Sequence, residues 1–104
     1  MSAIGKIRER IWSRDYFLSS HAEEEMIEDG LDRADIEHAI FKGFLDGKLT
    51  LDPRGIRYRV EGPAKDGRLV HVLCRFRESG PLIIITVYEP DLAHWESGFR
   101  RRKS

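Results

Sequence analysis

The sequence lacks the markers of several large classes of protein. Its single cysteine, Cys74, cannot form an internal disulfide, and no group of Cys and His residues has the spacing of a zinc site. No apolar run approaches the roughly 20 residues that a membrane-spanning helix needs, and residues 1–14 lack the apolar core of a signal peptide. No internal repeat and no linker rich in Pro, Gly or Ser divides the chain. We therefore expect one cytoplasmic domain over residues 1–104, with no cofactor, no bound metal and no membrane partner.

The formal net charge is zero, but the charge is unevenly distributed along the chain. Residues 1–14 carry a net charge of +3, residues 15–46 carry −8, and residues 47–104 carry +5. An acidic segment between two basic ones indicates an anionic partner for the basic parts. The alternative is that the three segments fold together into an ordinary mixed surface.

Three helices are expected, over residues 2–13, 20–30 and 32–43. Ile4, Ile7 and Ile11 recur at helical spacing in the first, and the other two are short, with clear starts and stops. The starts carry capping residues, which are Ser2, then Ser19 or Ser20 with Glu23, then Asp32 with Asp35; Gly30 and Gly43 end the second and third helices.

After Gly47 the apolar pattern changes from helical to extended. Four runs with strand character are joined by short turns: KLTLD, IRYRVEG, RLVHVLCRFR and PLIIITVYEP. They predict about four strands within residues 47–90, and residues 16–19 are read as either a brief strand or a buried link. The expected fold class is α+β, a small antiparallel meander with helices packed on one face. Residues 91–104 form a basic tail.

Strict alternation divides the side chains of the last three strands between two faces. One face is almost purely apolar and is expected to cover the helices: Tyr58, Val60, Val70, Val72, Cys74, Phe76, Ile83, Ile85 and Val87. Leu73, Leu82 and Ile84 fall on the opposite face, which also collects the polar residues Arg57, Arg59, His71, Arg75, Thr86 and Tyr88. This polar set is the main candidate for a functional site.

These residue types suit chemistry on a phosphodiester. Arginine forks bind phosphate in a bidentate manner and stay charged, whereas histidine and tyrosine can exchange protons. Cleavage of RNA by its own 2′-hydroxyl needs a base, an acid and cations that stabilise the phosphorane, and no metal. The structural alternative is that exposed strands carry Arg, Thr and Tyr because these side chains cover sheets well.

Several motifs resemble a known bacterial family. The runs SSHAEEEMIEDGLDRADIEHAIFKG, RYRVEG, DGRLVHVLCRF, LIIITVYEPD and HWESGFRRRK together resemble domain of unknown function 4258. Its members show a Ser-His-Ala opening to a helix, a second helix ending in Gly, a Gly-Arg hairpin and a Thr-Val-Tyr strand. The resemblance runs from about residue 16 to the end of the chain.

That family is thought to be similar to the RelE/ParE toxins, a small antiparallel sheet with helices packed on it. The resemblance implies an RNA-cleaving type II toxin with an antitoxin partner, such as the zinc-finger antitoxins encoded beside some members and beside MqsR-type toxins. It implies RNA as substrate and the ribosome as a further candidate partner. The matching catalytic candidates are His71 and Tyr88. Arg57, Arg59, Arg75 and Thr86, with Arg101 and Arg102 of the tail, are the candidates for binding RNA phosphates.

His21 opens the acidic helix and has three readings. It could bind a metal together with Glu24 or Glu25, which share its helix face, although no third ligand lies nearby in the sequence. It could be a packing residue in the first helical turn. It could also be catalytic, since a helix N-terminus disfavours a protonated imidazole and keeps it available as a base. We keep His21 as a secondary catalytic candidate.

Two other functions remain open. Zero net charge and the absence of a lysine from the predicted polar face favour a non-catalytic module of the same fold that binds protein or nucleic acid. Some RelE/ParE-type proteins poison gyrase, so a gyrase-directed toxin is a third hypothesis. A His and a Tyr among arginines favour the endoribonuclease.

Overall fold

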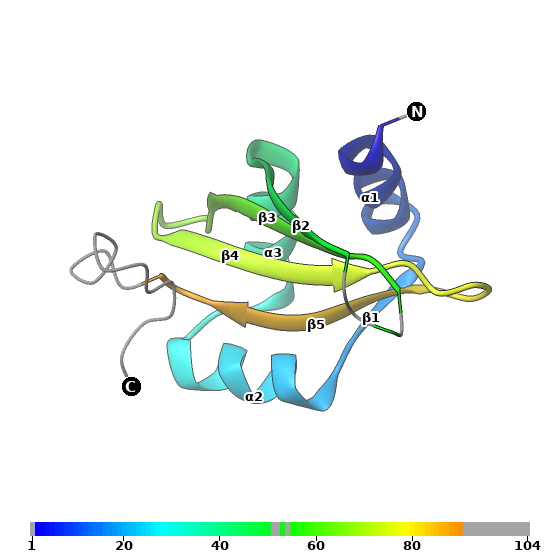
Figure 1. Ribbon diagram of the computed structural model, residues 1–104. Helices are drawn as coiled ribbons and strands as arrows, with labels where there is room; N and C mark the ends of the chain where they lie inside the picture. Colours follow the sequence, from blue (N-terminus) through cyan, green and yellow to red (C-terminus); the bar gives the residue numbers. More distant parts are fainter. Residues whose placement is uncertain (1, 51–52, 54, 91–104) are drawn as a thin grey trace.

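The computed structural model describes residues 2–50, 53 and 55–90, and they form three helices and five strands (Figure 1). In chain order the elements are α1 (Ala3–Trp12), β1 (Tyr16–Leu18), α2 (Ser20–Asp29), α3 (Arg33–Lys42), β2 (Phe44–Leu49), β3 (Arg57–Pro63), β4 (Leu69–Arg75) and β5 (Leu82–Tyr88). The strand order in the single sheet is β1-β5-β4-β3-β2. Strands β2 to β5 form an antiparallel meander, and β1 adds a short parallel edge. The expected α+β class is confirmed.

The helix starts follow from their capping residues. Ser2 accepts a hydrogen bond from the amide of Gly5, and Asp32 and Asp35 form the expected capping box. The second helix begins at the first of its two expected caps, since Ser19, not Ser20, is the N-cap and accepts from the amide of Ala22. The expected box of Ser20 with Glu23 is therefore wrong.

The hydrophobic core lies between the helices and one face of the sheet. Val60, Val72 and Val87 are directly opposite one another on β3, β4 and β5, and all three are fully buried. Against them pack apolar residues from each helix: Ile7, Ile11, Ala22, Met26, Ile36, Ala39 and Ile40. Helix α3 approaches β3 so closely that a β-carbon on Gly62 would come 2.0 Å from the carbonyl oxygen of Ala39. Only glycine fits at that position.

Two expectations about the strands need correction. There are five strands and not about four, because residues 16–18 do form β1, and strand structure begins at Phe44, before the expected limit of 47. The assignment of faces on β5 is also wrong for its first half. Leu82 and Ile84 are fully buried, whereas Ile83 and Ile85 are only partly so.

The cause is a bulge in β5. Leu73 of β4 pairs with Thr86, but Cys74 pairs with Ile84, so Ile85 is an extra residue in the ladder. Leu82 and Ile84 therefore face the core, while Thr86 and Tyr88 face the other side of the sheet. The bulge is tied to the start of α2, since Ser19 donates from its amide to Ile84 O and from its hydroxyl to Ile85 O, at 2.9 and 2.7 Å.

No helix in the described ranges combines the length and the apolar character needed to cross a membrane.

Candidate functional site

The face of the sheet opposite the core carries a row of side chains across four strands. Phe44 of β2 pairs with Glu61 of β3, Glu61 pairs with His71 of β4, and His71 pairs with Tyr88 of β5. Paired residues of neighbouring strands share a face of the sheet, so these four side chains are neighbours. We call Glu61, His71 and Tyr88 the polar row.

Hydrogen bonds connect the polar row through His71. Nε2 of His71 lies 2.8 Å from the Glu61 carboxylate, and Nδ1 lies 3.2 Å from the Tyr88 hydroxyl. A carboxylate only accepts hydrogen bonds, so Nε2 of a neutral His71 carries the proton and Nδ1 accepts from Tyr88. The rings of His71 and Tyr88 meet edge to face, with centroids 5.2 Å apart. The row therefore aligns hydroxyl, imidazole and carboxylate for proton transfer.

Burial sets the charge of His71. Its side chain is 0% exposed, and this desolvation lowers the pKa of His71 below its ordinary value of 6.5. The hydrogen bond to Glu61 opposes the shift, and the nearby charge of Arg59 adds to it. His71 is therefore neutral near pH 7 and able to take up a proton. Because it is buried, it reaches a ligand through its hydrogen-bond partners, and Tyr88, which is 8% exposed, is the one that lines a pocket with Arg59.

Arg59 lies beside the row and is held in place by Asp46. Its Nε and Nη2 atoms are each 2.8 Å from Oδ2 of Asp46. Asp46 is the extra residue of a bulge in β2, between the pairs of Leu45 with Val60 and of Gly47 with Arg59. Nη1 of Arg59 makes no hydrogen bond to any residue in the described ranges. The ion pair therefore orients a guanidinium that still has free donors.

A small pocket joins Arg59 to Tyr88. Its volume is about 280 Å³, and it is lined by Gly47, Lys48, Leu49, Arg59, Leu73 and Tyr88. Lys48 also lines this pocket. Alternation along the strands predicted no lysine on the polar face, but Lys48 lies in the same pocket as Arg59 of that face. The pocket is the place where an anion would meet both a cation and the hydroxyl of the polar row.

Thr86 and His21 form a separate chain of contacts. The Thr86 hydroxyl donates to Glu25 of α2, and Nε2 of His21 lies 3.6 Å from the same Glu25 oxygen. His21 is mostly exposed, whereas Thr86 is buried, with 8% of its surface exposed. His21 thus points to its own helix neighbour, and within the described residues no hydrogen bond or ion pair joins it to Tyr88 or Arg59. Thr86 is engaged in holding α2 to β5.

The remaining predicted residues lie elsewhere. Arg57 pairs with Leu49 in the β2–β3 ladder and Arg75 pairs with Ile83, and neither lines the small pocket. Arg101 and Arg102 lie outside the described residues. The structure therefore brings together three of the predicted residues, Arg59, His71 and Tyr88.

Two residues of the site were missed from the sequence. Glu61 continues the alternation of Arg57 and Arg59 by one step, so the pattern could have included it. Asp46 gave no such signal, because its orientation depends on the bulge in β2 and on a strand start at Phe44.

The same residues offer donors for a cation. Nε2 of His71 and one oxygen from each of Asp46 and Glu61 lie within 4.8 Å of one another, and imidazole and carboxylates are ligands for divalent transition metals. A metal would have to displace the Nε2 proton that Glu61 accepts and compete with Arg59 for Asp46. The contacts as they stand are those of a hydrogen-bonded relay.

Comparison with known proteins gives one match. The family model described as "Domain of unknown function (DUF4258)" matches residues 18–89. No curated protein and no solved structure gives a significant match. The matched segment extends from the end of β1 to just beyond β5, so it contains the whole polar row, Asp46 and Arg59, whereas α1 lies outside it.

Proposed function

The chain belongs to the family of domain of unknown function DUF4258, and from that premise we propose that it is an RNA-cleaving toxin, neutralised by an antitoxin, that needs no metal. One observation carries the proposal. Tyr88 and the oriented Arg59 line the same pocket, and the Tyr88 hydroxyl is hydrogen-bonded to a buried neutral imidazole. This combination supports the proposal, because it offers a cation for a phosphate and a proton acceptor beside one pocket.

In the proposed reaction, Tyr88 is the residue that touches the substrate. Its oxygen accepts the proton of a ribose 2′-hydroxyl while its own proton passes to Nδ1 of His71. The resulting imidazolium is stabilised by the Glu61 carboxylate, 2.8 Å from Nε2. His71 and Glu61 are then positioning residues that act through Tyr88, since His71 is wholly buried.

Arg59 supplies the electrostatic part. Attack of the 2′-oxygen on phosphorus forms one P–O bond, builds negative charge on the non-bridging oxygens and breaks the bond to the 5′-oxygen. The 5′-oxygen takes a proton from a water molecule, and the hydroxide left behind takes back the proton of the His71 imidazolium through Tyr88. The products are a 2′,3′-cyclic phosphate and a 5′-hydroxyl. Fixed donors at the developing charge are the largest contribution that such a site can make. The ion pair with Asp46 holds Arg59 ready for this role.

A non-catalytic binding module of the same fold is the second candidate. It is favoured by the burial of His71 and by the hydrogen bonds that satisfy both of its ring nitrogens. A satisfied buried network also serves to fix a unique sheet register. In that case the pocket would bind an anion of a partner molecule without chemistry.

The test is RNA cleavage by the purified chain, with and without ribosomes, followed by analysis of the fragment ends. We expect cyclic phosphate ends, cleavage that persists in EDTA, and a loss of about 100-fold or more in Tyr88→Phe. Arg59→Gln is expected to lose activity as well. Arg75→Gln is the matched control, since it removes a charge from the same predicted face away from the pocket.

Three outcomes separate the functions. Cleavage unchanged in Tyr88→Phe would refute the proposed site. Folded protein that binds RNA or a partner without cutting supports the binding module. Inhibition of DNA supercoiling with RNA left intact would point to a gyrase-directed toxin.

A further inference from the structure

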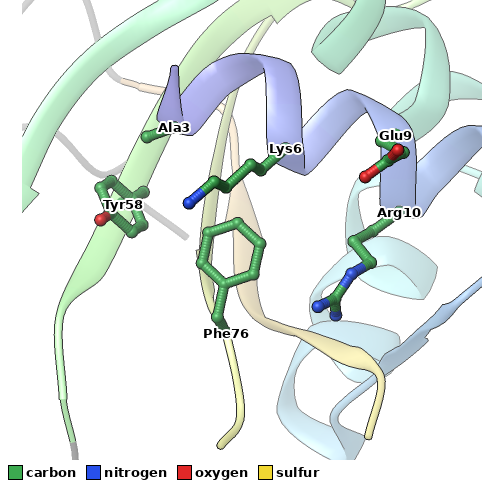
Figure 2. A pocket seen from close by; sticks show the side chains of 6 residues that line it. All are labelled: Ala3, Lys6, Glu9, Arg10, Tyr58 and Phe76. Carbon is green, nitrogen blue, oxygen red and sulfur yellow. The ribbon is translucent and has the colours of Figure 1, made fainter. Parts of the chain in front are cut away.

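A larger pocket lies on the opposite side of β3, under the N-terminal helix (Figure 2). Its volume is about 690 Å³, within the range of pockets that hold small ligands. It is lined by Ala3, Lys6, Glu9, Arg10, Tyr58 and Phe76.

One side of α1 is anchored to the end of α3. Arg8 donates to the carbonyl oxygens of Ile40 and Gly43 at 3.1 and 2.8 Å, which fixes α1 to the end of α3. The opposite side of the helix presents Lys6 and Arg10, one helical turn apart, toward the sheet. Figure 2 shows both side chains reaching from α1 toward Phe76. The helix therefore forms a basic roof over the start of β3 and the end of β4.

The floor of the pocket is aromatic. The rings of Tyr58 and Phe76 meet edge to face, with centroids 5.9 Å apart and an interplanar angle of 75°. Both are only partly buried. The guanidinium of Arg10 lies 5.4 Å from the Phe76 centroid and so fixes that ring from above. Held in this way, the two rings offer a contact surface at little cost in side-chain entropy.

The positive charges of Lys6 and Arg10 are only partly used in contacts within the described part of the chain. Lys6 makes no ion pair with any residue in the described ranges. Arg10 donates a hydrogen bond to Gly80 O at 3.3 Å and forms an ion pair with Asp15 at 3.7 Å. These two contacts leave several of its five N–H donors available. Among the described residues of the lining, Glu9 is the one acidic side chain. The pocket thus has a net positive charge above an aromatic surface.

We propose that this pocket binds a nucleotide, with the base against Tyr58 and Phe76 and the phosphate at Lys6 and Arg10. Aromatic rings accept any base by stacking, and lysine and arginine bind phosphate. The proposal does not rest on the ribonuclease, because Tyr58 and Arg59 are adjacent in β3 and face opposite sides of the sheet. Lys6 and Arg10 also lie outside residues 18–89, which match the family. The nucleotide could be free or part of an RNA strand.

The experiment is titration of the full chain, followed by NMR and calorimetry, with UMP, uridine, inorganic phosphate and a short 2′-O-methyl oligouridine that cannot be cleaved. We expect UMP to bind and to shift the resonances of Tyr58 and Phe76. Tyr58→Leu should weaken its binding about tenfold, and Lys6→Gln should weaken it to a similar extent. Lys65→Gln is the matched control, because Lys65 lies beyond the far end of β3 and is paired with Asp32.

Each outcome of the titration either supports or overturns the proposed nucleotide site. Binding of UMP reduced by both variants and kept in Lys65→Gln supports a site for free nucleotides. Binding of the oligonucleotide alone, with the same pattern of variants, supports a site for a nucleotide within RNA. Equal binding of inorganic phosphate and UMP, insensitive to Tyr58→Leu, would overturn the proposal, as would no shift with any ligand at millimolar concentration. Ribonuclease activity is assayed separately, and its loss in Tyr88→Phe leaves this result unaffected.

Discussion

Lowering the pH should destabilise the fold through His71, and the size of the effect can be bounded. Its side chain is 0% exposed, and burial keeps its pKa below the ordinary 6.5 of the unfolded chain. Between these two values the unfolded state binds more protons than the folded state, so stability rises with pH. The contribution is complete above pH 6.5 and is lost as the pH falls below it. If folded His71 stays neutral throughout, the loss from pH 7.5 to 5.5 is about 1.4 kcal/mol.

The assay is urea denaturation at several pH values in this range, for the wild type and His71→Gln. The variant lacks the titrating group, so its stability deficit relative to wild type should shrink by up to about 1.4 kcal/mol between pH 7.5 and 5.5. His38→Gln is the control for removal of a histidine, because His38 is a partly buried residue that bonds the carbonyl of Pro63.

The opposite trend would refute the reasoning. If wild type gains stability over His71→Gln as the pH falls, Glu61 and Asp46 hold an imidazolium more strongly than burial opposes it. His71 would then be charged near neutrality, and it could not accept a proton from Tyr88 in the proposed reaction.

Three further predictions concern the scaffold. Burial raises the pKa of the Cys74 thiol to about 12, so a thiol reagent at pH 8 should label the native chain only as fast as it opens, which mass spectrometry can follow. Gly62→Ala should lower the free energy of unfolding by about 3 kcal/mol or more, measured by urea denaturation, because the new methyl group would meet Ala39 O. Gly30→Ala should lower it by only about 1 kcal/mol, because Gly30 has open space around it but a φ of 66°. Asp32→Ala should cost about 1 kcal/mol by removing the N-cap of α3.

The sequence was most informative where local rules decide the structure. Asp32 with Asp35 predicted a capping box that the structure confirms, and Ser2 predicted the start of α1. The alternation of β3 and β4 correctly placed Val60, Val72 and Cys74 in the core. These features depend on residues within one turn or one strand, so a short window contains the cause.

The candidate site was harder to predict from the sequence, because the orientations of Asp46 and Tyr88 depend on two bulges. Strict alternation along β5 puts Leu82, Ile84, Thr86 and Tyr88 on one face, and the structure separates them at Ile85. Nothing in a single apolar strand indicates where an extra residue is accommodated. The anchor of this bulge, Ser19, is more than sixty positions away in the sequence.

The bulge in β5 explains why Tyr88 lies with the rest of the polar row. A shift of one residue in a strand moves every following side chain to the other face. Without the extra residue in β5, Tyr88 would face the core together with Ile84, away from His71. In β2 the extra residue is Asp46 itself, and its carboxylate anchors the Arg59 guanidinium. Bulges interrupt the ladder and are concentrated next to functional sites. The bulge in β5 also serves the core, because Ile84 and Val87 can both face the helices only with the extra residue between them. The same local feature therefore fills the core and brings Tyr88 beside His71.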